Sequence, residues 1–401
     1  MSQDFFKTIL FRSVCATRTI SVFIAIAMIQ GCSYFGGDDE DTSLLPAELI
    51  EFKETITVKK QWRASIGKSH EGLGIRLSPS TDGETIYAAS FDGNVTALNA
   101  KNGRKIWKNN FDLTFTSGPA YKDGILVLGT SNGELIAVDS LTGELLWSVN
   151  VSSEILAPAS IKGNQIFIRT VDGNLTALSI EDGGTLWTVN HKVPQLSLRG
   201  TTGPVSFANA VLSGFDDGKV SAYDINDGML LWETMLTPPG GRTEIEKITD
   251  IDAPLVIQGS EVYAGSYQGA LGGMALESGN LIWLIEASIY SGIATDDDDI
   301  YVSQADGSVM ALSRFTGREI WKKENLLNRY PSAPALLENS LIIGDLEGYI
   351  HWLDKKTGET QQRISVGSSK ITSTPLILDR TIYVLTDDGD LISILTLSNS
   401  S

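Results

Sequence analysis

The chain is poor in the residues that carry covalent and metal chemistry, since 401 residues include only two cysteines and three histidines. Cys15 lies in an N-terminal segment that resembles a removable signal, so a mature chain would keep Cys32 alone and could form no internal disulfide. The histidines show no metal-ligand spacing; they are His70, His191 and His351. Walker loops and haem-attachment motifs are also missing. No catalytic residue, metal site or cofactor is predicted.

Positive charge is also scarce. Lysine and arginine total 31 against 49 aspartates and glutamates, for a formal charge of −18. Because binding to nucleic acid depends largely on neutralising phosphates, this balance disfavours a nucleic-acid partner. An acidic surface is instead a common way for a protein to remain soluble.

Long apolar runs are limited to one, from Ile20 to Ile29, which is too short to span a bilayer. Basic residues precede it, so residues 1–31 are predicted to be an export signal. Gly31-Cys32 directly after this run resembles the lipobox of bacterial lipoproteins. The alternative is an ordinary signal peptide with an incidental cysteine.

The lipobox resemblance implies that Cys32 becomes the acylated N-terminus. Ser33 in the next position implies delivery to the outer membrane of a Gram-negative bacterium, where several acyl chains anchor a protein stably. Residues 32–54, which include an acidic stretch, are then predicted to be a solvated tether.

A glycine turn repeats eight times along the rest of the chain. The spacings between successive copies are 40, 40, 45, 51, 38, 41 and 41 residues. The turn glycines are Gly93, Gly133, Gly173, Gly218, Gly269, Gly307, Gly348 and Gly389. A period near forty indicates a supersecondary unit that buries its apolar face by stacking on neighbours.

Each unit reads as four antiparallel strands. Short runs with a period of two flank the glycine turns, and a proline precedes most turns by 14 or 15 residues, with Ile293 in that position in the sixth unit. Four-stranded sheets repeated in this way are propeller blades. The fold class predicted for residues 55–396 is therefore an all-β, eight-bladed β-propeller.

The chain ends predict how the ring closes. After Gly389 too few residues remain for a fourth strand, while the segment around Trp62 matches a fourth strand without the three before it. An N-terminal strand is therefore expected to complete the last blade, which removes an exposed sheet edge. Residues 397–401 are left as a tail.

Seven tryptophans occupy one position of the repeat, and six of them lie ten residues after an alanine or a glycine. The seven are Trp62, Trp107, Trp147, Trp187, Trp232, Trp283 and Trp321. We expect these indoles to pack between neighbouring blades, with Gln362 in the equivalent position of blade seven.

The segment Ala137 to Trp147 resembles the tryptophan-docking repeat of quinoprotein (PQQ) dehydrogenases. This resemblance specifies a fold and not a chemistry. The cysteine pair and long insertions typical of those enzymes are absent, and the run Asp296–Asp299 is interpreted as a solvated turn rather than a calcium site. A PQQ-dependent enzyme remains an alternative.

Two stretched spacings locate the candidate site. Trp187 to Pro204 takes 17 residues and Trp232 to Pro254 takes 22, so two consecutive connections between blades are enlarged. In a propeller such connections emerge on the same face as the glycine turns, so the two should be neighbours. Each loop alone could equally be local packing.

These loops and the N-terminus together resemble the BamB family, lipoproteins of the outer-membrane β-barrel assembly machinery. The resemblance implies a scaffold without catalysis that docks on the periplasmic POTRA domains of BamA. It assigns the contact to Leu196, Leu198 and Arg199 in the first loop and to Asp250 and Asp252 in the second. Direct binding of unfolded outer-membrane proteins is a further hypothesis, and an envelope scaffold with another partner is a further alternative.

Overall fold

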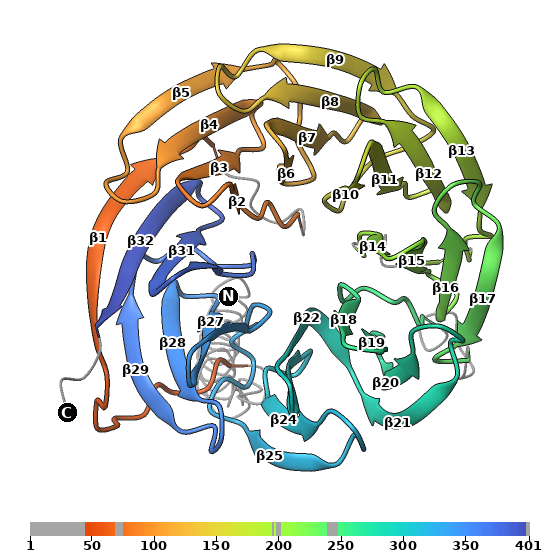
Figure 1. Cartoon of the computed structure of the whole chain (residues 1–401). Coiled ribbons are helices and arrows are strands. Elements are labelled where there is room, and N and C mark those ends of the chain that lie inside the picture. Colours follow the sequence, from red (N-terminus) through yellow and green to blue (C-terminus); the bar gives the residue numbers. More distant parts are fainter. Residues whose placement is uncertain (1–44, 69–74, 195, 198–201, 239–247, 398–401) are drawn as a thin grey trace, which may run out of the picture. The chain divides into compact units, whose positions relative to one another are not determined.

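The strands of the computed structural model form a closed ring, shown in Figure 1. The structure describes residues 45–68, 75–194, 196–197, 202–238 and 248–397, and within them every regular element is a strand. The strands group into eight four-stranded antiparallel sheets. The eight-bladed β-propeller predicted from the repeat is confirmed.

The blades follow one another along the chain. Blade one consists of β2 (Ser80–Thr81), β3 (Thr85–Ala89), β4 (Asn94–Asn99) and β5 (Lys105–Asn110). Blade two consists of β6 (Ala120–Lys122), β7 (Ile125–Gly129), β8 (Glu134–Asp139) and β9 (Leu145–Asn150). Blade three consists of β10 (Ser160–Lys162), β11 (Gln165–Arg169), β12 (Asn174–Ser179) and β13 (Thr185–Asn190). Blade four consists of β14 (Val205–Phe207), β15 (Ala210–Gly214), β16 (Lys219–Asp224) and β17 (Leu230–Met235).

The second half of the ring has the same order. Blade five consists of β18 (Val256–Gln258), β19 (Glu261–Gly265), β20 (Gly269–Ala275) and β21 (Leu281–Ala287). Blade six consists of β22 (Ile289–Thr295), β23 (Asp299–Gln304), β24 (Val309–Ser313) and β25 (Glu319–Lys323). Blade seven consists of β26 (Ala335–Leu337), β27 (Ser340–Gly344), β28 (Tyr349–Asp354) and β29 (Thr360–Ser365). Blade eight consists of β30 (Leu376–Leu378), β31 (Thr381–Leu385), β32 (Asp390–Leu397) and the N-terminal β1 (Thr57–Ser65).

The ring closes where β1 pairs with β32, as Figure 1 shows. Trp62 lies opposite Ser393, and Ile66 donates its N–H to the carbonyl of Gly389 at 2.8 Å. The first and last parts of the propeller are therefore held in one sheet. The predicted closure by an N-terminal strand is confirmed.

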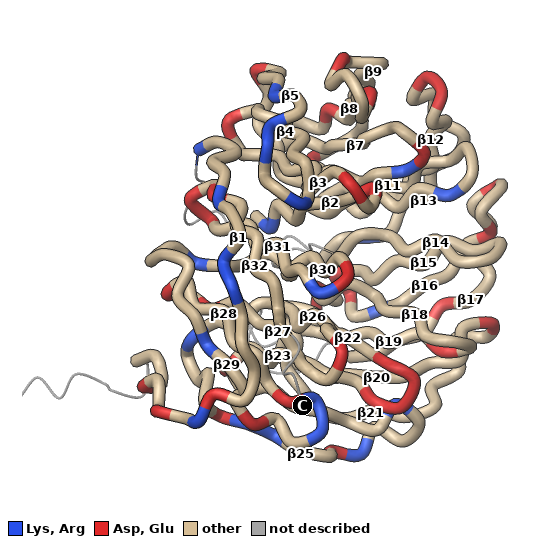
Figure 2. Tube along the Cα trace, turned by 60° about the vertical axis from the view of Figure 1, so that its left-hand side comes forward, with Lys and Arg blue, Asp and Glu red and all other residues tan. Residues whose placement is uncertain are grey.

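The core lies between the blades. The second and third strands of each blade are buried almost throughout, because neighbouring blades cover both of their faces, and they read as continuous apolar runs. One apolar cluster, for example, joins Leu212 and Trp232 of blade four to Val262 and Met274 of blade five. Figure 2 shows that charged residues lie mainly in turns and on outer strands such as β1.

The tryptophans connect each blade to the next, as predicted. All seven indoles donate Nε1 to a backbone carbonyl of the following blade at 2.7–3.1 Å. Trp107, for example, bonds to Ser140, and its ring lies against Gly143. Gly143 has φ +75°, and an added Cβ would lie 2.6 Å from the ring, so only glycine fits.

Each outer strand also carries one β-bulge, directly before the tryptophan position. The bulged residues are Gln61, Ile106, Leu146, Leu186, Leu231, Ile282, Ile320 and Gln361. A bulge interrupts the regular pattern of backbone donors and acceptors, which protects an edge strand from uncontrolled pairing.

Candidate docking surface

Two long connections form the candidate surface: one joins β13 to β14, and the other joins β17 to β18. Both start at the face that carries the glycine turns, because His191 donates its N–H to Gly173 at 2.9 Å and Leu236 donates to Gly218 at 2.9 Å. Near its end the first connection touches the second, where the Thr202 hydroxyl donates to the carbonyls of Ile251 and Ala253, the latter at 3.3 Å. The predicted adjacency of the two loops is confirmed.

The predicted contact residues occupy different environments. Leu196 is 44% exposed in the first connection. Leu198, Arg199 and the proposed lipidation site Cys32 lie outside the described residues.

Asp250 and Asp252 are buried, with exposures of 0% and 1%. The prediction that they fix a partner's orientation places them on the surface, whereas the chain itself covers them. The backbone explains this position: the Tyr267 N–H donates to the Asp250 carbonyl at 3.0 Å, and the Ile251 N–H donates to Phe215 at 3.2 Å. A role of Asp250 and Asp252 in docking stays a prediction. Because both are buried, they are better placed to support the loops than to contact a partner directly.

A stacked histidine lies at the start of the first connection. The ring of His191 stacks on Phe215 with a centroid distance of 3.9 Å, and its Nε2 lies 3.1 Å from Oδ2 of Asp217. Burial lowers the pKa of His191, although Asp217 and Glu233 act in the opposite direction. The neutral imidazole therefore packs as an aromatic side chain that joins blade three to blade four.

Beneath it, Arg169 and Asp216 form an ion pair whose side chains are 3% and 1% exposed. The Arg169 guanidinium also lies 5.3 Å from the Phe215 ring centroid. In the described part of the chain, Nε and Nη1 of Arg169 have no hydrogen-bond partner. Loss of one member of a buried ion pair typically lowers the free energy of unfolding by about 3–5 kcal/mol. This pair therefore stabilises the base of the loops. The sequence alone could have indicated this pair, because Arg169 ends a buried strand at a position where several other blades have glycine.

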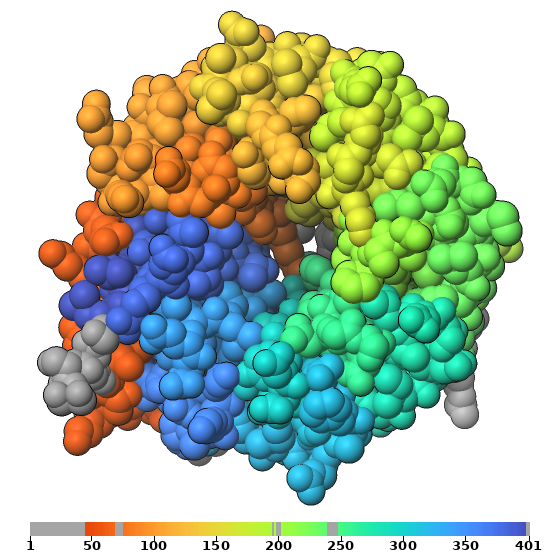
Figure 3. Space-filling view, in the orientation of Figure 1, coloured from red at the N-terminus to blue at the C-terminus, as the bar shows by residue number. Residues whose placement is uncertain are grey.

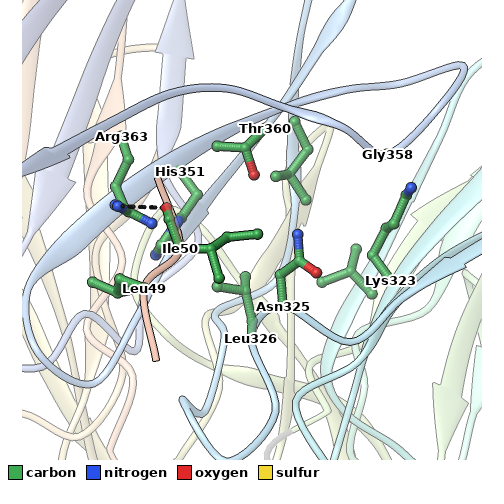
Figure 4. Close-up of a pocket in the computed structure, with 11 residues that line it drawn as sticks. Leu49, Ile50, Lys323, Asn325, Leu326, His351, Gly358, Thr360 and Arg363 are labelled. Carbon is green, nitrogen blue, oxygen red and sulfur yellow. Dashed lines mark hydrogen bonds between the residues drawn. The ribbon is translucent and has the colours of Figure 1, made fainter. Parts of the chain in front are cut away.

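A third element lies on blades six and seven: residues 46–56, which we call the strap. Ala47 exchanges hydrogen bonds of 2.9 Å with the Leu327 carbonyl and with Nη1 of Arg329. Figure 4 shows the strap passing Arg363, whose Nη2 donates to the Ile50 carbonyl at 3.2 Å. Residues 46–54, predicted as the end of a solvated tether, are thus bound to the ring.

The strap covers a buried charge cluster. Arg329 Nε lies 2.8 Å from Asp345 Oδ2, and His351 Nε2 lies 3.0 Å from the same oxygen. Leu49 and His351 line one shallow pocket (Figure 4). Burial lowers the pKa of His351, and the neighbouring Arg329 and Arg363 oppose the pull of Asp345. The imidazole is therefore neutral in the folded protein.

The aspartate run is a turn between β22 and β23, as interpreted. The Asp296 carboxylate accepts hydrogen bonds from the backbone N–H groups of Asp298 and Asp299 at 3.1 and 2.9 Å. It also forms an ion pair of 2.7 Å with Lys355. Over the ranges described, no group of three or more potential ligands could hold a metal, and no helix is long and apolar enough to cross a membrane.

Known proteins match this chain over most of its length. The family model for "Outer membrane protein assembly factor BamB" matches residues 91–323. A protein of that name from Pseudomonas aeruginosa is 46% identical over 374 residues, which cover 93% of this chain and 97% of the relative. The Escherichia coli protein of that name is 32% identical, with 92% and 97% covered.

The chain belongs to the BamB family. Its fold agrees with the crystal structure of BamB from Moraxella catarrhalis, at a TM-score of 0.77 and 27% identity, with 84% of this chain and all of that one covered. The family resemblance inferred from the loops and the N-terminus is therefore confirmed.

Some enzymes share this fold at low sequence identity. The quinohemoprotein alcohol dehydrogenase from Comamonas testosteroni superposes with a TM-score of 0.69 at 13% identity. The BamB relatives are named as assembly factors.

Proposed function

We propose that this protein is a non-enzymatic scaffold of outer-membrane protein assembly that docks on the POTRA domains of BamA through the two long connections. The observation that supports the proposal best is the contact between these connections, in which Thr202 bonds to the backbone at Ile251 and Ala253. This buried contact packs the two connections together although some fifty residues separate them in the sequence.

Each part of the surface has a distinct role in this proposal. Leu196, which is exposed, enters an apolar groove of the partner together with Leu198, while Arg199 supplies charge-assisted hydrogen bonds. Asp250 and Asp252 hold the second connection in the shape that receives the first. The buried pair of Arg169 and Asp216 below keeps this surface preformed.

Copurification with the barrel protein tests the docking. Arg199→Glu should abolish copurification with BamA while the midpoint of thermal unfolding stays within about 2 °C of wild type, as expected of a surface change. Arg318→Glu is the matched control, because Arg318 lies exposed in a turn at the opposite face and undergoes the same charge reversal. Undiminished copurification of Arg199→Glu would contradict the docking assignment.

The proposal also includes membrane attachment through lipidated Cys32, with the ring facing the periplasm. Residues 32–45 then link the anchor to the strap, and fourteen extended residues span at most about 50 Å. Cys32→Ser should move the protein from the outer-membrane fraction to the soluble periplasmic fraction. If the Cys32→Ser variant stayed in the outer-membrane fraction after washing, in membranes that lack BamA, the lipid anchor would be refuted.

Unfolded outer-membrane proteins are a further proposed partner. Each outer strand lies at the edge of its sheet, and the residues after its bulge, such as Trp147–Asn150, keep a regular backbone that an extended segment can pair with. Crosslinking from Ser148, compared with the exposed Thr142 in the turn of the opposite face, should capture an unfolded barrel protein at the former alone. Equal capture at both positions would contradict strand pairing.

A further inference from the structure

A small cavity lies where four of the connections between blades lead into the innermost strands. Its volume is about 60 Å³. Arg76, Tyr290, Tyr330, Lys370 and Thr372 are among the residues that line it. They precede or begin the first strands of blades one, six, seven and eight, which are the innermost strands of the ring (Figure 1). Figure 3 shows the central hollow that the inner strands surround. The proposed docking connections start at the same face.

Arg76 reaches across this hollow. Its Nη1 donates to the carbonyls of Tyr290 and Ser291, both at 3.0 Å. The guanidinium carbon lies 4.2 Å from the centroid of the Tyr290 ring. Blades one and six are not neighbours in the ring, so these contacts hold a cation inside the ring mouth.

Lys370 supplies a second cation on the other side. Its ammonium lies 5.1 Å from the centroid of the Tyr330 ring. Tyr330 is 60% exposed and has φ +47°. A bulky aromatic residue in the left-handed region is rare, and such strained residues concentrate at binding sites.

No carboxylate in the described part of the chain forms an ion pair with either cation, Arg76 or Lys370, although the net charge of the chain is −18. The nearby Asp387 accepts a hydrogen bond from the Thr372 hydroxyl at 2.6 Å. Two cations, each against an aromatic face, therefore line one cavity of a chain whose net charge is negative.

We propose that this cavity binds a carboxylate group of a partner polypeptide. Arg76 and Lys370 would hold the two oxygens by charge-assisted hydrogen bonds, which are strong where tyrosine rings limit access of water. The cavity has room for a carboxylate. The carboxylate could come from a chain terminus or from an acidic side chain, and this chemistry is independent of the loops proposed to dock on BamA.

Three short fluorescent peptides, built on one sequence without charged side chains, distinguish a terminal carboxylate from a side-chain carboxylate. The first has a free C-terminal carboxylate, the second is amidated, and the third is amidated with a single internal aspartate. Fluorescence anisotropy with the full-length protein in detergent should show binding of the first or the third, and the amidated uncharged peptide should bind at least about tenfold more weakly.

Variants of the cavity complete the test. Lys370→Gln should weaken binding of the carboxylate peptide by roughly tenfold, and Lys370→Arg should preserve it. Lys356→Gln removes the same charge from an exposed turn at the opposite face and should have no effect. Arg76→Gln should act like Lys370→Gln, with thermal unfolding followed in parallel. Equal binding of all three peptides, or unchanged affinity in Lys370→Gln, would overturn the proposal without touching the copurification result.

Discussion

Nε2 of Gln362 donates a hydrogen bond of 3.1 Å to the carbonyl of Ile56. Gln362 occupies the position at which the other seven blades have a tryptophan bonded to the next blade. Blade eight is assembled from both ends of the chain and lacks the turn between its third and fourth strands, so the acceptor comes from the residue directly before β1. Blade seven still has a large ring at this level: Trp352 lies opposite Gln362 on the neighbouring strand and is fully buried.

This bond predicts that Gln362→Ala lowers the free energy of unfolding by about 1–3 kcal/mol, since the Ile56 carbonyl loses its donor beside a buried position. Urea denaturation followed by tryptophan fluorescence measures the change. Glu51→Ala, an exposed change in the strap, should leave stability within about 0.5 kcal/mol of wild type. A loss no larger for Gln362→Ala than for this control would show that closure does not depend on the bond.

The contact between tryptophan and glycine can be separated from backbone strain by two alanine substitutions. Gly163 has φ +57° and open space around it, so Gly163→Ala should cost about 1–2 kcal/mol from the left-handed backbone alone. Gly143 has φ +75° and lies against Trp107, so Gly143→Ala should cost an additional 1–3 kcal/mol or so from overpacking. Equal losses in chemical denaturation would mean that the indole moves aside freely.

The strap should be released by a single substitution. Arg363 bonds to the Ile50 carbonyl and lies 5.2 Å from the centroid of the Phe52 ring. Arg363→Ala removes both contacts, so hydrogen exchange of residues 46–56 should accelerate while exchange in β1 changes little. Arg318→Ala serves as the control for loss of positive charge. Protection of the strap as in wild type would indicate that Ala47, together with Thr55, whose N–H donates to the Gln361 carbonyl at 3.0 Å, holds it without Arg363.

Stability should fall on mild acidification because His351 is buried in its neutral form. Its pKa is lowered in the folded state, so below about pH 6.5, the ordinary histidine value, the unfolded chain binds a proton that the folded chain does not. Unfolding free energies between pH 7.5 and pH 5 should therefore decrease as pH falls. The decrease should be smaller in His351→Gln, which keeps a donor toward Asp345; an identical slope in both proteins would show that His351 does not cause it.

The propeller itself could be predicted because its signals are local and repeated. A turn glycine, two flanking apolar runs and a tryptophan recur in nearly every blade, so each unit reports the same structure independently. Closure was predictable for a related reason: the unit around Trp62 is incomplete at one end and the unit after Gly389 at the other. The paired strands β1 and β32 have the expected partners.

The candidate site was predictable only in position. Irregular spacing locates the two connections, and their contact through Thr202 follows from the order of the blades. The burial of Asp250 and Asp252 does not follow, because it depends on how segments without any periodicity fold over one another.

The ring, its closure and the indole contacts between blades follow from the amino-acid sequence, since short-range patterns specify strands, turns and their neighbours. The burial of connection residues, the position of the strap on blades six and seven, and the shared cavity of Arg76 and Lys370 depend on tertiary packing. Those contacts join residues up to some three hundred positions apart. Their geometry depends on the completed ring, which brings the connections of separate blades to one face.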